Sequence, residues 1–484
     1  MKFGGIDHDR RASRPMTSVT LFGGVARIGG NCVLLEDADS SLLVDLGKDF
    51  YEYQRYFEFP FKLPSKSVER ELLKTGVLPR IRSQRHGELP VYVDFDGTAK
   101  EPKVETPLKD VILSHSHADH SGFLSILRHD IRIHLGGLTR VIYSATMESK
   151  RESSLETKLY WSNDEQRLTF RDFHSGSVFR VGQIEVEAHA VDHSIPGAYG
   201  FIFNTNSGRV GYTGDLRMHG PASNLTERFV QRLEKEPLDL LLCEGTNMNV
   251  GRTGSEKQLE ADAVGLISRG FHRGNKLVIA EVRSTDIDRM NAFHRVAGKL
   301  DCDFFVTRRV AYLLHRIRRS GLAKRLWFGL PDLTKDAKVI TSARRRPQSW
   351  EKEVLTSPGV ETVEEDVIRR PGRRTMVLDS GRFDIFELTP PPGSLYIESV
   401  SEHVSEEEEF GEERFLNGLA LHGIVVYRLH SSGHAGPEDL VNMILRAKPK
   451  KLVPIHTEHP EAFRELFKGM CDVVLPEKGV PIFV

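Results

Sequence analysis

The segment 111–122 holds the densest group of side chains that could do chemistry. An apolar strand runs there into three histidines and one aspartate within six positions. Because side chains alternate along a strand, His115 and His117 can face one point. After the following turn, Asp119 and His120 can face a second point nearby. Imidazole and carboxylate groups are ligands for zinc and manganese, and two adjacent ions would form a clamp for hydrolysis at phosphorus or at a carbonyl. Because no packing requirement asks for this pattern, we interpret it as a metal site rather than a polar loop.

Other predicted strands also end beside a histidine or an acidic residue. His189 and His193 compete as candidates, because the first lies on a strand and the second follows it. Taken alone, Asp215 and Glu244 would be interpreted as turn residues. The full set of candidates at strand ends is His189, His193, Asp215, Glu244, His434 and His456. Their assignment as functional residues therefore depends on whether they belong to one site.

Composition is that of a globular enzyme. A chain of 484 residues suggests two or more domains, and a hydrophobic content of 39% is ample for a large core. The formal net charge of −1 gives no global basic field for nucleic acids, although local patches can suffice. The four cysteines are scattered without a CxxC pair, as expected for reduced core residues. No apolar run approaches membrane-spanning length, and the N-terminus lacks the apolar core of a signal peptide, so we expect no membrane and a cytoplasmic location.

The segment 111–122 resembles the signature of the metallo-β-lactamase superfamily. Predicted strands at 17–24, 31–36 and 41–47 look like the opening of that fold. In the family, a strand-borne aspartate followed by glycine lies under the metal site. The resemblance therefore makes Asp45 a candidate to orient a ligand histidine, and the alternative is a turn aspartate.

Later motifs are similar to one branch of the superfamily. His193, followed by Ser-Ile-Pro, is similar to the third metal motif of the ribonuclease J group, which favours it over His189. Glu244, His434 and His456 match three motifs that define the β-CASP branch, whose members act on nucleic acids. The chain ends 28 residues after His456, which resembles the archaeal relatives that lack a further C-terminal domain.

The resemblance implies an α/β protein: a metallo-β-lactamase αββα sandwich with an inserted α/β β-CASP domain. A helix at 258–270 and strands at 276–280 and 303–306 predict a parallel sheet in the insert. The expected divisions are a disordered lead at 1–15, the first part of the metallo-β-lactamase domain at 16–250, the β-CASP domain at 251–430 and the C-terminal part of the first domain at 431–484.

The resemblance also implies a mechanism, the metal-assisted hydrolysis of RNA phosphodiesters. Two divalent ions are expected, zinc first and manganese as the alternative. Asp215 would be shared by both ions, and a bridging water would attack phosphorus. Asp119 and Glu244 would take part in catalysis, with Glu244 orienting His434 to protonate the leaving oxygen. The expected ligands are His115, His117 and His193 for one ion, and Asp119, His120 and His456 for the other.

A pocket for the terminal phosphate is expected at Ser431, Ser432 and Gly433. The glycine allows close approach of the backbone, and the following helix offers N–H groups to an anion. The family often has serine where this chain has Gly436, so the pocket could be built differently here. Arginines at 308–325 could track phosphates, and a solvated helix face is the alternative.

The expected function is thus a ribonuclease, 5′-to-3′ exonucleolytic with endonuclease activity as an addition, that binds RNA and could form a homodimer. A DNA-processing β-CASP nuclease is the nearest alternative, but such members typically lack a histidine at the position of His456. A small-molecule hydrolase would not need Glu244, His434 or the insert. A non-catalytic RNA-binding paralogue is disfavoured because every ligand position is filled.

Overall fold

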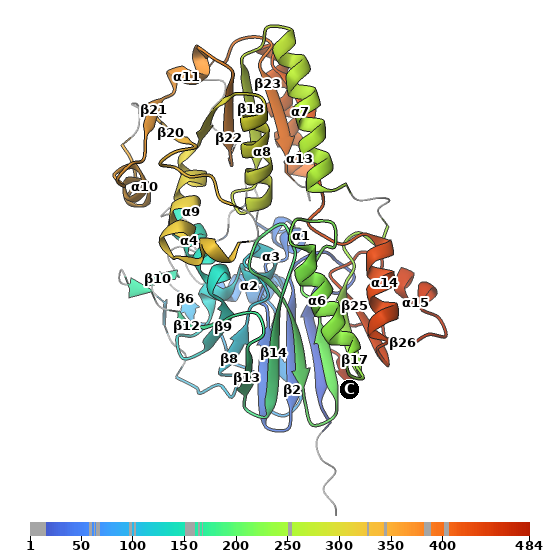
Figure 1. Cartoon of the computed structure of the whole chain (residues 1–484). Coiled ribbons are helices and arrows are strands. Elements are labelled where there is room, and N and C mark those ends of the chain that lie inside the picture. Colours follow the sequence, from blue (N-terminus) through green and yellow to red (C-terminus); the bar gives the residue numbers. More distant parts are fainter. Residues whose placement is uncertain are drawn as a thin grey trace, which may run out of the picture.

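The computed structural model describes the chain from residue 16 to residue 484, apart from several short gaps. The gaps are 58–60, 62, 64–67, 96–98, 101–102, 151–159, 163–164, 167, 250–253, 327–328, 343–345, 382–388 and 401–405. The lead at 1–15, which we expect to be disordered, lies outside the described residues. The expected fold class is confirmed: an α/β protein with a sandwich of two large sheets and a third sheet in a separate layer (Figure 1).

The first sheet of the sandwich begins the chain. Along each strand, successive side chains point to opposite faces of the sheet. One face packs in the core between the two sheets, and helices cover the other. In order across the sheet they are β12 (Thr169–Phe173), β9 (Arg132–Gly136), β8 (Asp110–Ile112), β3 (Ser40–Val44), β2 (Cys32–Asp37), β1 (Ser18–Gly23) and β27 (Pro481–Phe483). Three short hairpins accompany it: β4 (Arg82–Ser83) with β5 (Gly87–Glu88), β6 (Asp94–Phe95) with β7 (Ala99–Lys100), and β10 (Trp161–Ser162) with β11 (Glu165–Gln166).

The second sheet faces the first across an apolar core. Val19, Val33 and Val44 from the first sheet meet Val186, Phe201 and Val453 from the second in that core. In order, the strands of the second sheet are β13 (Val178–Val181), β14 (Ile184–Val191), β15 (Ala198–Asn204), β16 (Arg209–Tyr212), β17 (Leu240–Glu244), β25 (Lys451–Ile455) and β26 (Asp472–Val473).

Helices cover both outer faces of this sandwich. On the first sheet lie α1 (Phe50–Gln54), α2 (Val68–Thr75), α3 (Ala118–Ser121), the 3₁₀ turn η1 (Leu124–Ile126) and α4 (Gly137–Ser149). On the second lie α6 (Ser223–Glu234), α14 (Pro437–Ala447) and α15 (Pro460–Leu466). The C-terminal segment, drawn in orange to red, returns to the sandwich beside α6 (Figure 1). Its strands β25 and β27 join one sheet each.

The insert between β17 and β25 carries the third sheet, in which the described strands all pair in parallel, as the repeating strand–helix pattern predicts. In order, its strands are β21 (Thr362–Glu364), β20 (Lys338–Thr341), β19 (Asp303–Val306), β22 (Thr375–Asp379), β18 (Leu277–Val282), β23 (Leu395–Ser399) and β24 (Val425–Arg428). Its helices are α7 (Glu256–His272), α8 (Ile287–Lys299), α9 (Arg308–Arg319), η2 (Leu322–Arg325), α10 (Ser349–Leu355), α11 (Asp366–Arg369) and α13 (Glu406–Leu421).

The insert packs on the end of the sandwich where α3 and α4 lie (Figure 1). Ile142 and Ala145 of α4 share an apolar core with Tyr312 and Leu313 of α9. The strands β16, β17 and β25 run parallel, so their carboxyl ends meet at one edge. The loops after β8, β14, β16 and β25 carry the candidate metal ligands. Among the described residues, no helix is both long and apolar enough to cross a membrane.

Four of the five arginines of α9 contact carboxylates. Arg308 lies 3.5 Å from Glu351, Arg318 lies 3.1 Å from Asp332, and Arg319 lies 2.7 Å from Glu353. Arg316 pairs with Glu148 of α4. These pairs favour the interpretation of the cluster as a salt-bridged helix face over a track for phosphates, because four arginines of α9 already pair with acids of neighbouring elements.

Candidate metal centre

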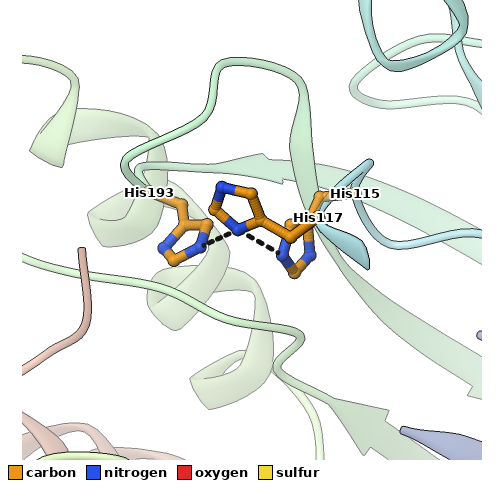
Figure 2. A group of neighbouring side chains, drawn as sticks. All are labelled: His115, His117 and His193. Carbon is orange, nitrogen blue, oxygen red and sulfur yellow. Dashed lines mark hydrogen bonds between the residues drawn. The ribbon is translucent and has the colours of Figure 1, made fainter. Parts of the chain in front are cut away.

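Three histidines from two loops bring ring nitrogens together. His115 and His117 follow β8, and His193 follows β14. The Nδ1 atom of His117 lies 3.1 Å from Nε2 of His115 and 3.1 Å from Nε2 of His193. Figure 2 shows the ring of His117 between the other two. All three side chains offer an atom to one point, within 4.8 Å of one another.

A second group lies beside the first and draws on three segments of the chain. It consists of Asp119, His120, Asp215 and His456, with ligand atoms again within 4.8 Å of one another. Asp119 and His120 sit on α3, the short helix that follows the first histidines. The Oδ2 atom of Asp119 lies 3.1 Å from Nε2 of His456, and Oδ2 of Asp215 lies 3.1 Å from Nε2 of His120.

Asp215 stands between the two groups. On one side, its Oδ2 atom is 3.7 Å from Nε2 of His115 and 3.9 Å from Nε2 of His193. On the other side, the same atom is 3.1 Å from Nε2 of His120 and 3.8 Å from Nε2 of His456. Its Oδ1 atom is buried without a hydrogen-bond partner among the described residues. A buried, unpaired carboxylate oxygen is costly, so this atom has the surroundings expected of a ligand.

The turn before Asp215 depends on a glycine. Gly214 has φ of +56°, and a Cβ added there would stand 2.6 Å from the carbonyl oxygen of Tyr199. Only glycine satisfies both conditions. The Gly-Asp pair at the end of β16 therefore delivers the carboxylate into the centre.

Burial sets the charge of the first three histidines. It lowers the pKa of His117 to about 4, and it lowers the pKa values of His115 and His193 well below their usual range. These imidazoles are neutral at pH 7, as metal ligands must be. The pKa of His120 behaves differently: burial lowers it, but Asp215 and Asp45 outweigh burial and raise it well above its usual range.

The two carboxylates stay ionised despite burial. Burial acts to raise the pKa of Asp119 and of Asp215, but His120 and His456 outweigh it and hold both below the usual range. The pocket thus combines the neutral imidazoles of His115, His117 and His193 with two carboxylates. Together with the unpaired Oδ1 of Asp215, this donor set fits divalent metal ions such as zinc or manganese.

Asp45 orients one of the ligand candidates. This aspartate is fully buried at the end of β3, and its Oδ2 atom accepts hydrogen bonds from Nδ1 of His120 at 2.7 Å and from the hydroxyl of Tyr212 at 2.7 Å. Ser114 donates to the same carboxylate through its backbone N–H and its hydroxyl. Asp45 thus contacts a candidate ligand histidine, the contact that the resemblance leads us to expect.

Backbone and hydroxyl groups hold two further histidines. Nδ1 of His193 donates to the carbonyl oxygen of Gly433 at 2.5 Å, and the hydroxyl of Thr246 lies 2.8 Å from Nδ1 of His456. A Cβ at position 433 would stand 2.6 Å from Oγ of Ser194 and 3.1 Å from the His193 ring. Gly433 thus allows the loop after β24 to reach His193, one of the candidate ligands.

Glu244 and His434 form a pair at the edge of the centre. Glu244 is the last residue of β17 and is fully buried, and both its carboxylate oxygens lie 3.3 Å from Nδ1 of His434. The backbone N–H groups of Leu216 and Thr246 donate to the same carboxylate. Burial acts to lower the pKa of His434, but Glu244 outweighs it and raises this pKa to about 9. His434 therefore carries a proton near the candidate ligands, 4.0 Å from Asp215.

The two serines of the expected phosphate pocket differ in whether their hydroxyl hydrogen is already used in a hydrogen bond within the protein. Ser431 is buried, and its hydroxyl donates to the carbonyl oxygen of Gly254 at 2.9 Å, so this hydrogen is used inside the protein. The hydroxyl oxygen of Ser432 accepts from the N–H of His434 at 3.1 Å and from Asn247 at 2.9 Å. Its own hydrogen is not committed by these bonds. The structure thus leaves Ser432 better suited than Ser431 to meet a ligand.

Several contacts of the centre escape sequence reasoning. Nδ2 of Asn31 lies 2.9 Å from Nε2 of His120, and Tyr212 and Thr246 reach Asp45 and His456 as described above. The signal for Tyr212 and Thr246 is their position beside Asp215 and Glu244 at strand ends. No comparable signal marks Asn31. His189, the less favoured candidate beside His193, pairs with Glu187 outside the ligand groups, and His134 pairs with Asp110.

Comparison with known proteins agrees with this geometry. A model described as beta-lactamase superfamily domain matches residues 94–258, and one described as Zn-dependent metallo-hydrolase RNA specificity domain matches residues 424–484. The chain is 24% identical to Ribonuclease J of Mycolicibacterium smegmatis, over 96% of this chain and 74% of that protein. It is 22% identical to Ribonuclease J of Mycoplasma pneumoniae, over 94% of this chain and 70% of that protein.

A solved structure supports the fold. A protein of unknown function from Enterococcus faecalis V583 superposes with a TM-score of 0.73 and 23% sequence identity, covering 97% of this chain and all of that one. At this identity the likeness bears on the fold alone, and it includes the insert as well as the sandwich.

Proposed function

We propose that this chain, which belongs to the ribonuclease J-like β-CASP branch of the metallo-β-lactamase superfamily, hydrolyses RNA phosphodiesters and proceeds from the 5′ end. The observation that carries the proposal is the position of Asp215 between two groups of ligand atoms, with the Glu244–His434 pair beside them. A small-molecule hydrolase of the same fold would have no use for that pair.

His115, His117 and His193 would hold one divalent ion, and Asp119, His120 and His456 the other, with Asp215 shared. When bound, two zinc ions would supply Lewis acidity and an activated water for attack at phosphorus. The donor set also admits manganese. Asp45, Gly433 and Thr246 contribute by fixing the ring orientation of His120, His193 and His456.

His434 would act on the leaving group. Its Nδ1 faces Glu244, which leaves Nε2 of the same ring to donate a proton to the departing ribose oxygen. The buried Glu244 carboxylate, fixed by two backbone N–H groups, holds the ring in place and stabilises its charged form. Asp119 combines its role as a ligand with stabilisation of charge near the reacting phosphate.

The 5′-end preference would depend on the loop 431–436 and on helix α14. Helix α14 begins at Pro437 without a side-chain cap, so its first N–H groups can bind an anion. Ser432 and Gly433 border this turn, and Ser431 supports it from inside. The absence of serine at position 436 leaves the backbone and Ser432 to bind a terminal phosphate.

Three further points belong to the proposal. The domain division at 16–250, 251–430 and 431–484 follows the path of the chain through the sheets.

A cytoplasmic location is supported by four free cysteines, since reducing compartments keep thiols unpaired. A homodimer is proposed from the family alone, and light scattering would test it.

The proposal can be tested with RNA and DNA of one sequence, labelled at the 5′ end. RNA with a 5′-monophosphate should yield labelled mononucleotides first, and faster than RNA with a 5′-triphosphate. The Asp215→Ala variant should be inactive on both. If both RNAs were cut only at internal positions and at equal rates, the activity would be that of an endonuclease. Faster cleavage of DNA than of RNA would overturn the proposed substrate.

A further inference from the structure

A buried group of charged side chains lies between the sandwich and the insert, outside the candidate metal centre. Its members come from the loops after β14 and β16 and from helices α7 and α8. They are Asp192, Arg217, Glu256, Asp286, Asp288 and Arg289, and each is at most 9% exposed. Burying so many charges is costly unless each is paired, so the pattern of pairs shows what the group holds together.

Arg217 joins the two loops that carry His193 and Asp215. Its Nε donates to Oδ1 of Asp192 at 3.1 Å, and its backbone N–H donates to the carbonyl oxygen of Asp192 at 2.8 Å. The hydroxyl of Thr226 closes the link, since it donates to the carbonyl of Arg217 and accepts from the N–H of Asp192. Asp192 directly precedes His193, and Arg217 follows Asp215 by two positions.

The other end of the same guanidinium reaches the insert. Its Nη2 pairs with Asp288, which lies in the first turn of α8. Its Nη1 lies 3.8 Å from Oε1 of Glu256 on α7 and has no hydrogen-bond partner among the described residues. One rigid, planar fork thus contacts the sandwich and the insert at once, which a lysine ammonium cannot do with the same geometry.

We propose that Arg217 is a positioning residue that ties helix α8 of the insert to both metal-ligand loops, so that Asp288 sustains metal binding without touching a ligand. The inference rests on the proposed metal centre. Loss of the Asp288 carboxylate leaves a buried cation with too few partners, and the loops at 192–193 and 215–217 must shift to solvate it. Changes around ligands of this kind typically cost about 10–100-fold in metal affinity.

The experiment compares zinc binding by chelator competition in the wild type, Asp288→Asn and Arg217→Lys, with thermal unfolding measured on the same samples. Asparagine keeps the shape of the aspartate, and lysine keeps the charge of the arginine but loses its fork. Both variants should bind zinc about 10–100-fold more weakly than the wild type.

Arg209 provides the matched control. It is also a buried arginine, but it donates to the carbonyls of Arg232, Leu233 and Glu236 at the end of α6, away from the ligand loops. Arg209→Lys should lower the melting temperature and leave zinc affinity unchanged. Folded Asp288→Asn or Arg217→Lys with wild-type zinc affinity would overturn the inference. A wild type that binds neither zinc nor manganese would instead overturn the proposed function.

Discussion

His434 lies at the edge of the centre, where its Nδ1 faces the buried carboxylate of Glu244. Its ligand atoms could also be grouped with His193 and Asp215, or with Glu244 and His456, so geometry alone admits both a ligand and an acid. The bond to Glu244 favours the acid, because it stabilises the protonated ring. The two roles predict different zinc contents when His434 is substituted: a ligand should be needed to hold the metal, and a general acid should not.

The first prediction separates these roles. His434→Ala should lower the single-turnover rate of RNA cleavage by roughly 10²–10⁴-fold, the range for general acid–base catalysis. Zinc content, measured by elemental analysis, and RNA affinity should stay near those of the wild type. His189→Ala is the matched control, since His189 is a half-buried histidine that pairs with Glu187 outside the ligand groups, and its rate should not change. Loss of zinc from His434→Ala would make His434 a ligand.

Sequence reasoning succeeds for residues whose partners are implied by local spacing. The spacing of His115, His117, Asp119 and His120 after one strand already predicts two facing points, and the structure brings these side chains into two groups. It fails for Asn31, because the contact with His120 joins positions 89 apart and an asparagine near a turn has many ordinary explanations. Such contacts depend on the packing of sheets, which single-residue patterns do not specify.

At the scale of elements, α9 illustrates how a charge run can mislead. Its five arginines are dense in sequence, yet in the structure four of them pair with acids of α4, α10 and the loop at 332. An arginine already neutralised by a carboxylate releases few counterions from RNA. Exposed pairs of this kind also contribute only about 0–1 kcal/mol to stability.

The second prediction follows from those pairs. The double variant Arg318→Gln, Arg319→Gln should bind single-stranded RNA with the same dependence of affinity on salt as the wild type, because Asp332 and Glu353 occupy both side chains. Fluorescence anisotropy over a range of salt concentrations gives the slope of log K against log salt. A slope smaller by about 1.4, or about 0.7 for each lost phosphate contact, would show that both arginines do bind the RNA.

Strands and helices themselves are well predicted by their apolar patterns. The predicted helix at 258–270 is observed as α7, Glu256–His272, with Ser255 as its cap. The strand predicted at 276–280 is β18, Leu277–Val282. The order of strands is not available from such patterns, because β25 joins β17 and β27 joins β1 across hundreds of residues. Those pairings follow from the family resemblance and from packing, and they bring His456 to the centre.

At the scale of the whole molecule, the metal centre connects distant parts of the chain. Its candidate ligands come from the loops after β8, β14 and β16 and from the C-terminal return after β25. Ions bound by these loops would link the two sheets of the sandwich. They would also link the part of the chain before the insert to the part after it. Because the unfolded chain does not hold the ligands together, metal binding should stabilise the native state.

The third prediction is therefore that zinc raises the melting temperature. Chelator-treated protein should unfold at a lower temperature than protein with two equivalents of zinc, and excess zinc should raise the transition further. A ligand at 100 times its Kd stabilises by about 2.7 kcal/mol, which corresponds to several degrees for a chain of ordinary unfolding entropy. Asp215→Ala should lose most of this increment, because Oδ2 of Asp215 lies near both groups of ligands. Equal melting temperatures with and without zinc would contradict the two-ion centre, and a full increment in Asp215→Ala would show that Asp215 is not shared by the two ions.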